Sequence, residues 1–235
     1  VVAALGGVRQ GMRYMTSTGG ETLPPGVDAA KIIVERSVPW TAMEEAILAW
    51  ELNGAPLPLA HGGPLRVVIP GYYGVNNVKY VKRLAFTVDE TQANIQKSGY
   101  RVRDIGKKGD PTQPSMWEMN LKSFVTHPSA DGQNLRAGLL QVQGVAFSGG
   151  SPVRGVEVSV DGGKTWQTAR FVGPHMGRHA WRQFVAQVNL PPGKYMITSR
   201  AIAADGSTQP EQRVENERGY AHNGWRDHAL TVTVA

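Results

Sequence analysis

The sequence contains no cysteine, which excludes disulfide bonds, thiolate metal sites and cysteine nucleophiles. Long apolar runs are also absent, and none approaches the roughly 18 residues that a membrane-spanning helix needs. The GxSxG elbow, the Walker A loop, HExxH and GxGxxG are missing as well. We therefore expect no membrane span and none of the chemistries that these motifs define.

Acidic residues are outnumbered by basic ones, and the formal net charge is +6. This excess suits an anionic ligand or an acidic protein partner. The basic residues are spread along the chain and form no Lys/Arg tract, and the aromatic residues do not form an RRM-type signature. We therefore expect no nucleic-acid partner.

Glycine and proline are abundant, with 28 and 15 residues, and they separate many short Val- and Thr-containing runs. This composition favours strands and turns over long helices. With 235 residues, 41% of them hydrophobic, the chain can form one large domain or two ordinary ones. We predict a mostly β, globular protein.

Residues 1–126 show a mixed α+β pattern. The apolar opening, Val1–Val8, resembles the end of a helix, so we expect its apolar side to face protein on a missing N-terminal segment or a complementary chain. Thr41 is a suitable N-cap with Glu44 three residues later, which predicts a helix to about Leu52 that ends at Asn53-Gly54. Further predictions are strands at 12–17 and 65–69, a turn followed by extended structure at 75–86, and a long loop at 99–115.

Residues 127–235 have the pattern of an antiparallel, immunoglobulin-like sandwich, because strand-length runs alternate with turn residues at roughly ten-residue spacing. Asp161-Gly162-Gly163 predicts a tight hairpin, and Trp166 should lie in or beside the core. We place the domain boundary near residue 127. The predicted strands are 139–147, 153–160, 165–172, 184–188, 194–203 and 230–234.

The histidines do not by themselves indicate a metal site. His175 and His179 are four residues apart, but the neighbouring glycines and proline argue against the helix that would place them on one face. His222 and His228 fit hydrogen-bonding roles in a loop. Cations on Gly-rich loops commonly bind oxyanions, although solvated surface charge explains most single arginines equally well. The anion-binding candidates are Arg66, Lys79, Arg101, Arg103, Arg218 and Arg226.

Three linked motifs in the first segment resemble the molybdopterin domain of the sulfite oxidase family. They are A-W-E-L-N-G-A-P-L-P at 49–58, H-G-G-P-L-R-V-V-I-P-G at 61–71 and G-V-N-N-V-K at 74–79. The second segment is similar to the dimerisation domain of the same family through the hairpin at 155–166 and the ending at 209–226. The resemblance implies a partial molybdopterin-binding domain over 1–126 and an immunoglobulin-like dimerisation domain over 127–235.

The resemblance also implies site residues. His61, Arg66, Asn77, Val78 and Lys79 match the family's contacts to the molybdenum-molybdopterin cofactor. Tyr100 matches a tyrosine beside the metal's oxo groups, and Arg218 matches an arginine of the substrate pocket. Glu21 is a looser match to an acidic pterin contact. The family's molybdenum ligand is a cysteine, so no metal ligand is assigned within this sequence.

The activity implied by the resemblance is oxidation of sulfite to sulfate, with electrons passed to a haem protein such as cytochrome c. The runs 77–86 and 111–117 look closer to bacterial periplasmic sulfite dehydrogenases, which implies a periplasmic location. The resemblance of the second segment to the dimerisation domain implies a homodimer. One alternative is a sulfane dehydrogenase-type molybdoprotein of a thiosulfate-oxidising complex. Another is a non-enzymatic, immunoglobulin-like dimerisation or binding module.

Overall fold

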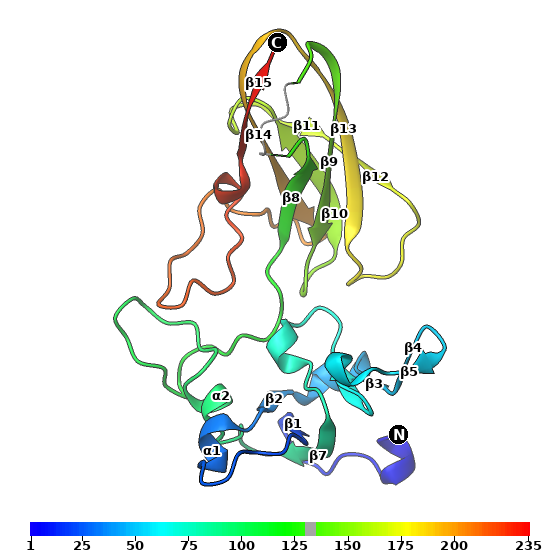
Figure 1. Cartoon of the computed structure of the whole chain (residues 1–235), viewed down its shortest axis with the longest axis vertical. Coiled ribbons are helices and arrows are strands. Elements are labelled where there is room, and N and C mark those ends of the chain that lie inside the picture. The colour runs from blue at the N-terminus through cyan, green and yellow to red at the C-terminus, as the bar shows by residue number, and fades with distance from the viewer. Residues whose placement is uncertain (130–134) are drawn as a thin grey trace. The chain divides into compact units, whose positions relative to one another are not determined.

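The structure is a computed structural model that describes residues 1–129 and 135–235. It is mostly β-sheet with a few short helices (Figure 1). The chain divides into two compact units: one contains Val1–Trp117 and Asn216–Tyr220, and the other contains Glu118–Glu215 and Ala221–Ala235. The predicted boundary near residue 127 falls at the end of strand β8 (Lys122–His127), which pairs within the second unit.

The first unit is built on a three-stranded antiparallel sheet in the order β2-β1-β7. Its buried core consists of Met15, Val38, Val67 and Ile69. The strands are β1 (Tyr14–Gly19), β2 (Glu35–Pro39), β3 (Ile47–Ala49), β4 (Glu51–Leu52), β5 (Ala55–Pro56), β6 (Arg66–Val68) and β7 (Val81–Thr87), with β3 paired to β6 and β4 to β5. The helices are α1 (Ala29–Ile32), α2 (Asn94–Lys97) and the 3-10 turns η1 (Ala3–Leu5), η2 (Trp40–Glu44), η3 (Leu59–His61) and η4 (Gly74–Asn76).

The helix predicted from Thr41 to Leu52 is wrong. Only the η2 turn forms there, and the chain then extends into β3, where Leu48 packs against the core of the first unit. Pairing with β6 outweighs the local capping signal because it satisfies the backbone of β3 and packs Leu48, partly buried, against the core. Asn53 and Gly54, expected to end a helix, are both at positive φ in the turn between β4 and β5, as a type I′ hairpin requires.

Other elements predicted for the first unit are present in the structure. The strand expected at 65–69 is confirmed as β6, and 75–86 contains η4 followed by most of β7. Residues 99–115 form a loop without helix or strand, closed by a single bridge between Arg101 and Ser115. The opening segment forms a single 3-10 turn, and Val1 before it and Leu5 at its end are both exposed.

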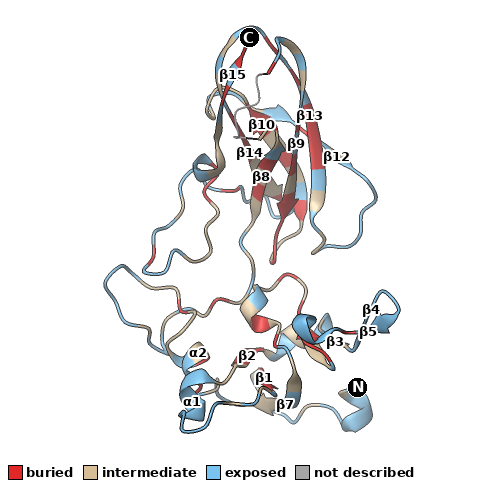
Figure 2. Ribbon diagram, in the orientation of Figure 1, coloured by how far each residue is buried: buried red, intermediate tan, exposed pale blue. Residues whose placement is uncertain are grey.

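The second unit contains two four-stranded antiparallel sheets, β11-β10-β14-β15 and β12-β13-β9-β8. Residues from both sheets form one buried cluster that includes Val142, Phe184 and Ile197. Figure 2 shows buried positions on the strands of this unit and mainly exposed positions on its loops. The remaining elements are β9 (Gly138–Phe147), β10 (Val153–Ser159), β11 (Gln167–Thr168), β12 (Arg170–Val172), β13 (Arg182–Leu190), β14 (Gly193–Ala203), η5 (Arg226–His228) and β15 (Leu230–Val234).

The predicted strand segments of the second unit all contain strands, although 165–172 is divided into β11 and β12. Gly162 and Gly163 turn the chain at positive φ, and Asp161 accepts hydrogen bonds from the backbone of Lys164 and Thr165. Trp166 lies beside the core, where its ring meets buried Trp225 edge-on at 5.2 Å. Within the described residues, no helix is long and apolar enough to cross a membrane.

Candidate functional site

Two of the predicted cofactor ligands converge on one turn of the first unit. Arg66, at the start of β6, donates from Nη1 to the carbonyl oxygen of His61 at 2.7 Å. Lys79 donates from Nζ to the carbonyl oxygen of Ala60, also at 2.7 Å. We call His61, Arg66 and Lys79 the basic turn. The two cations are therefore held by neighbouring carbonyls of η3.

Backbone pairing sets the geometry of the basic turn. The amide of Tyr80 donates to Gly62 at 3.1 Å, and the amide of Val81 donates to Leu65 at 2.8 Å. Gly62 has φ 101°, and a Cβ there would lie 2.7 Å from Cγ of Lys79. Glycine is therefore required at this position both by conformation and by the close approach of the lysine.

Asn77 and Val78 support the basic turn from the following segment. The Asn77 carbonyl accepts from Nη2 of Arg66 at 3.2 Å, and its side-chain oxygen accepts from the amide of Ile69 at 2.5 Å. Val78 has a side chain that is 2% exposed, and its carbonyl accepts from the amide of Val67. Asn77 thus orients Arg66, whereas the side chain of Val78 serves packing.

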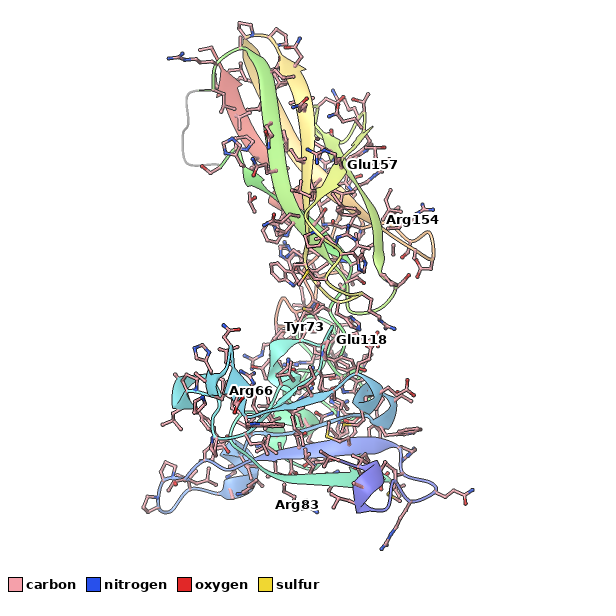
Figure 3. All side chains as sticks on the ribbon, turned by 90° about the vertical axis from the view of Figure 1, so that its right-hand side faces the viewer. Arg66, Tyr73, Arg83, Glu118, Arg154 and Glu157 are labelled. Carbon is pink, nitrogen blue, oxygen red and sulfur yellow. The ribbon has the colours of Figure 1, made fainter. Side chains whose placement is uncertain are left out.

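The charge of the basic turn is not neutralised by the part of the chain that the structure describes. In residues 1–129 and 135–235, neither Arg66 nor Lys79 forms an ion pair with a carboxylate. Figure 3 marks Arg66 in the first unit. Its Nε is buried without a hydrogen-bond partner among the described residues. Arginine and lysine donors with unused capacity fit an anionic group such as the phosphate of a pterin cofactor.

The looser candidate Glu21 belongs to a segment that approaches the same region. A Cβ on Gly20 would lie 2.6 Å from the carbonyl oxygen of Tyr80, the residue after Lys79. Glu21 folds back over Gly19, and its Oε2 is buried without a hydrogen-bond partner among the described residues. The segment is therefore a neighbour of the basic turn.

Tyr100 and Arg218 are brought into the same unit, although 117 residues separate them in the sequence. The ring of Tyr100 stacks on Tyr220 with centroids 5.3 Å apart and an interplanar angle of 16°. The amide of Glu217 donates to the carbonyl of Arg103 at 2.9 Å, which fixes the returning segment against the 99–115 loop. Arg218 lies on this segment with an exposed side chain.

Sequence reasoning missed a buried polar cluster that underlies Tyr100. Arg36 is 1% exposed and donates from Nε and Nη2 to the side-chain oxygen of Asn76 at 3.2 and 3.0 Å. Its Cζ lies 5.8 Å from the centroid of the Tyr100 ring. Burial, and then the nearby charge of Arg101, lower the pKa of Arg36 to about 10. The motif analysis gave no signal for Arg36 because its partners are distant in the sequence.

Arg101 forms the second half of this cluster. It is 2% exposed, forms an ion pair with Glu90, and donates to the carbonyls of Gln96 and Gln113 at 2.8 and 3.0 Å. Its expected role as an anion ligand therefore does not fit the structure, because its three donor nitrogens already have partners. Arg101 instead anchors the loop that carries Tyr100.

The η4 turn links the cluster to the basic turn. Asn76 faces Arg36, and the next residue, Asn77, contacts Arg66. Asn76 also donates from Nδ2 to the carbonyl of Met116 at 2.9 Å, and it is 1% exposed. Two consecutive asparagines therefore connect Arg36 to Arg66 within the first unit.

The other sequence candidates lie elsewhere or have other partners. Arg103 donates to the carbonyls of Lys107 and Arg101, and Arg226 pairs with Glu211 in the second unit. His175 and His179 lie in a loop without a helix. In the described ranges, no group of three or more His, Cys, Asp and Glu residues could hold a metal ion.

His222 and His228 face each other in the second unit, with ring centroids 5.1 Å apart. His222 lies 3.0 Å from a carboxylate oxygen of Asp227, which also pairs with Arg213. Burial, followed by the charges of Lys122 and His222, lowers the pKa of His228 to about 4. The neutral form of His228 is therefore favoured in the folded unit.

Comparison with protein-family models identifies two matches. Residues 1–95 match an oxidoreductase molybdopterin binding domain, and residues 113–233 match a Mo-co oxidoreductase dimerisation domain. The chain is 34% identical to mitochondrial sulfite oxidase of Macaca fascicularis over 201 residues, covering 80% of the chain and 36% of that protein. It is 34% identical to sulfite oxidase of Gallus gallus over 192 residues, covering 77% and 42%.

A solved structure also matches over nearly the whole chain. The sulfane dehydrogenase SoxCD from Paracoccus pantotrophus is 29% identical, with a TM-score of 0.77, covering 99% of this chain and 59% of that chain. Among the sequence relatives, the chain spans 36% of the length of the macaque sulfite oxidase. The family resemblance drawn from the motifs is confirmed, and the chain belongs to the sulfite oxidase family of molybdopterin oxidoreductases.

Proposed function

We propose that this chain is part of a periplasmic molybdenum-dependent enzyme that oxidises sulfite to sulfate and passes the electrons to a haem protein such as cytochrome c. In this reaction sulfite gains one oxygen atom from water and releases two electrons and two protons. The observation that carries the proposal is the basic turn, where Arg66 and Lys79 converge without a carboxylate partner among the described residues. The names of the sulfite oxidase relatives support sulfite as the substrate.

The basic turn would hold the molybdopterin cofactor. Arg66 and Lys79 would neutralise its phosphate, and His61 offers an exposed ring at the end of η3. Asn77 keeps Arg66 in place through its carbonyl. When bound, the cofactor supplies the two-electron redox chemistry that no side chain of this sequence provides.

Tyr100 and Arg218 would act on the substrate. Arg218 carries an exposed guanidinium, which can form two parallel hydrogen bonds with an oxyanion. The hydroxyl of Tyr100 can donate a hydrogen bond to a reacting oxygen, and its ring is held on Tyr220. The contribution of these residues is to orient a small anion and to stabilise its charge.

Steady-state kinetics of the cofactor-loaded protein test this assignment. Replacing Arg218 with Gln should raise the sulfite KM and lower kcat/KM by about 10², because a charge-assisted contact is worth roughly 1.5–3 kcal/mol and more when desolvated. Molybdenum content and folding should stay near those of the parent. Arg83→Gln, on β7 and well apart from Arg66 in Figure 3, serves as the matched control. Unchanged kinetics for Arg218→Gln would remove Arg218 from the site.

A second candidate is oxidation of sulfane sulfur within a thiosulfate-oxidising complex. The match to the sulfane dehydrogenase SoxCD over 99% of this chain favours it. Turnover of sulfane sulfur carried on a protein, with little turnover of free sulfite, would support this alternative. A protein that releases no fluorescent oxidised pterin on denaturation would instead fit a non-enzymatic binding module.

The second unit, in this proposal, is an immunoglobulin-like domain that forms a homodimer. Its two four-stranded sheets with one shared core support this classification, as does the match to a dimerisation domain. Light scattering should give twice the monomer mass at micromolar concentration. A monomer throughout that range would refute the dimer and leave the fold assignment intact.

A further inference from the structure

Left-handed backbone conformations occur at Tyr100 and directly after Lys79, two residues of the proposed site. Among the described residues, four that are not glycine have positive φ: Asn53, Tyr80, Tyr100 and Ala221. Asn53 belongs to the hairpin turn between β4 and β5, whereas Tyr80 follows Lys79 and Ala221 follows Tyr220. Such conformations persist only where the surroundings hold them, and they are common at functional sites. The left-handed conformation of Tyr100 must therefore be maintained by its contacts with neighbouring residues.

The backbone of Tyr100 is held on both sides. Its φ is 49°, and its carbonyl accepts from the amide of Met116 at 2.9 Å. The next residue, Arg101, is anchored by Glu90 and by two backbone carbonyls. The amide of Gly99 donates to Asn94 at 2.7 Å on the other side. The freedom that remains is rotation of the Tyr100 side chain.

Ring contacts govern that rotation. Among the described residues, no hydrogen bond holds the hydroxyl of Tyr100, so its direction depends on what the ring touches. The ring stacks on Tyr220 at 5.3 Å, and the guanidinium of Arg36 lies 5.8 Å from its centroid. Offset aromatic stacking and a nearby cation each favour a particular ring orientation.

Tyr220 is itself fixed by a compact turn. Its amide donates to the side-chain oxygen of Asn216 at 2.9 Å, and its carbonyl accepts from Nδ2 of Asn216 at 2.8 Å. Asn216 is 8% exposed, and its own carbonyl accepts from the amide of Gly219. Gly106 donates from its amide to the carboxylate of Glu217 at 2.6 Å, which ties the turn to the loop of Tyr100. Tyr220 thus presents a preorganised surface.

We propose that Tyr220 is a positioning residue whose ring aims the hydroxyl of Tyr100 at the substrate, a role that rests on the proposed function. Arg36 supports the same orientation from the buried cluster. In this proposal Tyr220 acts only through Tyr100 and does not touch the reacting atoms. A misdirected hydroxyl would weaken an interaction made in the transition state and so lower kcat more than it raises KM.

The test compares Tyr220→Leu, which removes the ring, with Tyr220→Phe, which keeps it. In the cofactor-loaded protein, Tyr220→Leu should lower kcat/KM about ten- to a hundredfold, mainly through kcat. Tyr220→Phe should retain most of the parent's activity. Tyr14→Leu is the matched control, because Tyr14 also has an aromatic neighbour, Trp117 at 6.3 Å, within the first unit.

A second readout is independent of activity. With 3-fluorotyrosine placed at position 100, the ¹⁹F resonance should move in Tyr220→Leu as the ring current is lost, and stay near the parent's in Tyr220→Phe and Tyr14→Leu. If Tyr220→Leu does not fold, Tyr220→Met, which keeps volume without a ring, replaces it. Parent-like kinetics in Tyr220→Leu, or an unmoved resonance, would overturn the proposal.

The outcomes separate this proposal from the proposed function. A parent protein that loads cofactor but oxidises neither sulfite nor sulfane sulfur would refute the function, and the ¹⁹F comparison would still decide whether Tyr220 orients Tyr100. An active parent with an equally active Tyr220→Leu variant would refute the positioning role alone.

Discussion

At the scale of single residues, two consecutive carboxylates after β7 form ion pairs that should contribute differently to stability. Asp89 pairs with Arg13 at 2.7 Å, and both side chains are more than half exposed. Glu90 pairs with Arg101, and their side chains are 18% and 2% exposed. Solvent screens the first pair, whereas the second compensates a guanidinium that has lost its hydration.

We predict that Glu90→Ala lowers the free energy of unfolding by about 3–5 kcal/mol, because it leaves the buried charge of Arg101 without compensation. Asp89→Ala, the adjacent control, should change it by roughly 0–1 kcal/mol. Chemical denaturation of both variants measures the difference. Equal destabilisation would show that burial does not distinguish the two pairs.

Cofactor retention is a second property that single residues control. Replacing Arg66 with Gln removes a cation and the buried Nε donor of the basic turn. Retention of the pterin should weaken about ten- to a hundredfold, since a hydrogen bond from a charged group is worth roughly 1.5–3 kcal/mol. Fluorescence of the oxidised pterin released on denaturation measures the content. Arg83→Gln should retain the parent's content, and an equal loss in both variants would contradict the assignment.

At the scale of elements, η5 and the segment before it contain a pH-sensitive contact. His228 is half-buried, and Lys122, His222, Asp227 and Arg213 act on it electrostatically. Its pKa of about 4 in the folded unit lies below the ordinary value of 6.5. As the pH falls from 6.5 to about 4, the unfolded chain binds a proton that the folded unit does not. The free energy of unfolding of the second unit should therefore decrease across this window. Below about pH 4, His228 should cause no further decrease, because it is then protonated in both states.

The variant His228→Gln tests this linkage. It should flatten the dependence of Tm on pH between about 6.5 and 4, because the group that binds the extra proton on unfolding is gone. His175→Gln, in an exposed loop, should leave the slope unchanged. Thermal melts at half-unit pH intervals provide the measurement. A slope that persists in His228→Gln would assign the acid sensitivity to other groups.

At the scale of the whole molecule, each unit has its own core. Ile197 is fully buried among the sheets of the second unit, and Val67 is 1% exposed in the first. Separate cores allow the two units to lose their structure with different free energies.

Removing core volume should therefore act locally. Ile197→Ala should destabilise the second unit by about 2–5 kcal/mol, through lost apolar burial and the cavity that remains. Hydrogen exchange would report this as faster exchange of β14 amides, with β1 amides unaffected. Val67→Ala should produce the opposite pattern. Faster exchange in both units from either variant would show that they unfold together.

The strands of the second unit were predicted more successfully than the elements of the first unit, for a physical reason. The strands of the second unit follow from local alternation and turn residues, which mark each strand separately, although β10 pairs with the distant β14 and β13 with the distant β9. The stretch 41–52 carries a helical cap and apolar periodicity, yet it forms β3 and β4 once β6 supplies a partner. Local pattern alone does not contain that pairing.

Residue types at short spacing were enough to predict the family and the mostly β architecture, and they also select His61, Arg66 and Lys79 as candidates for the cofactor site. The packed structure was needed to show that Arg101 is an internal anchor, that Arg36 reaches Asn76, and that Tyr220 stacks on Tyr100. The contact of Arg36 with Asn76 and that of Tyr100 with Tyr220 join residues 40 and 120 positions apart. They form because closing a long loop costs only slightly more than closing a short one, so burial and stacking select the partner and sequence distance does not.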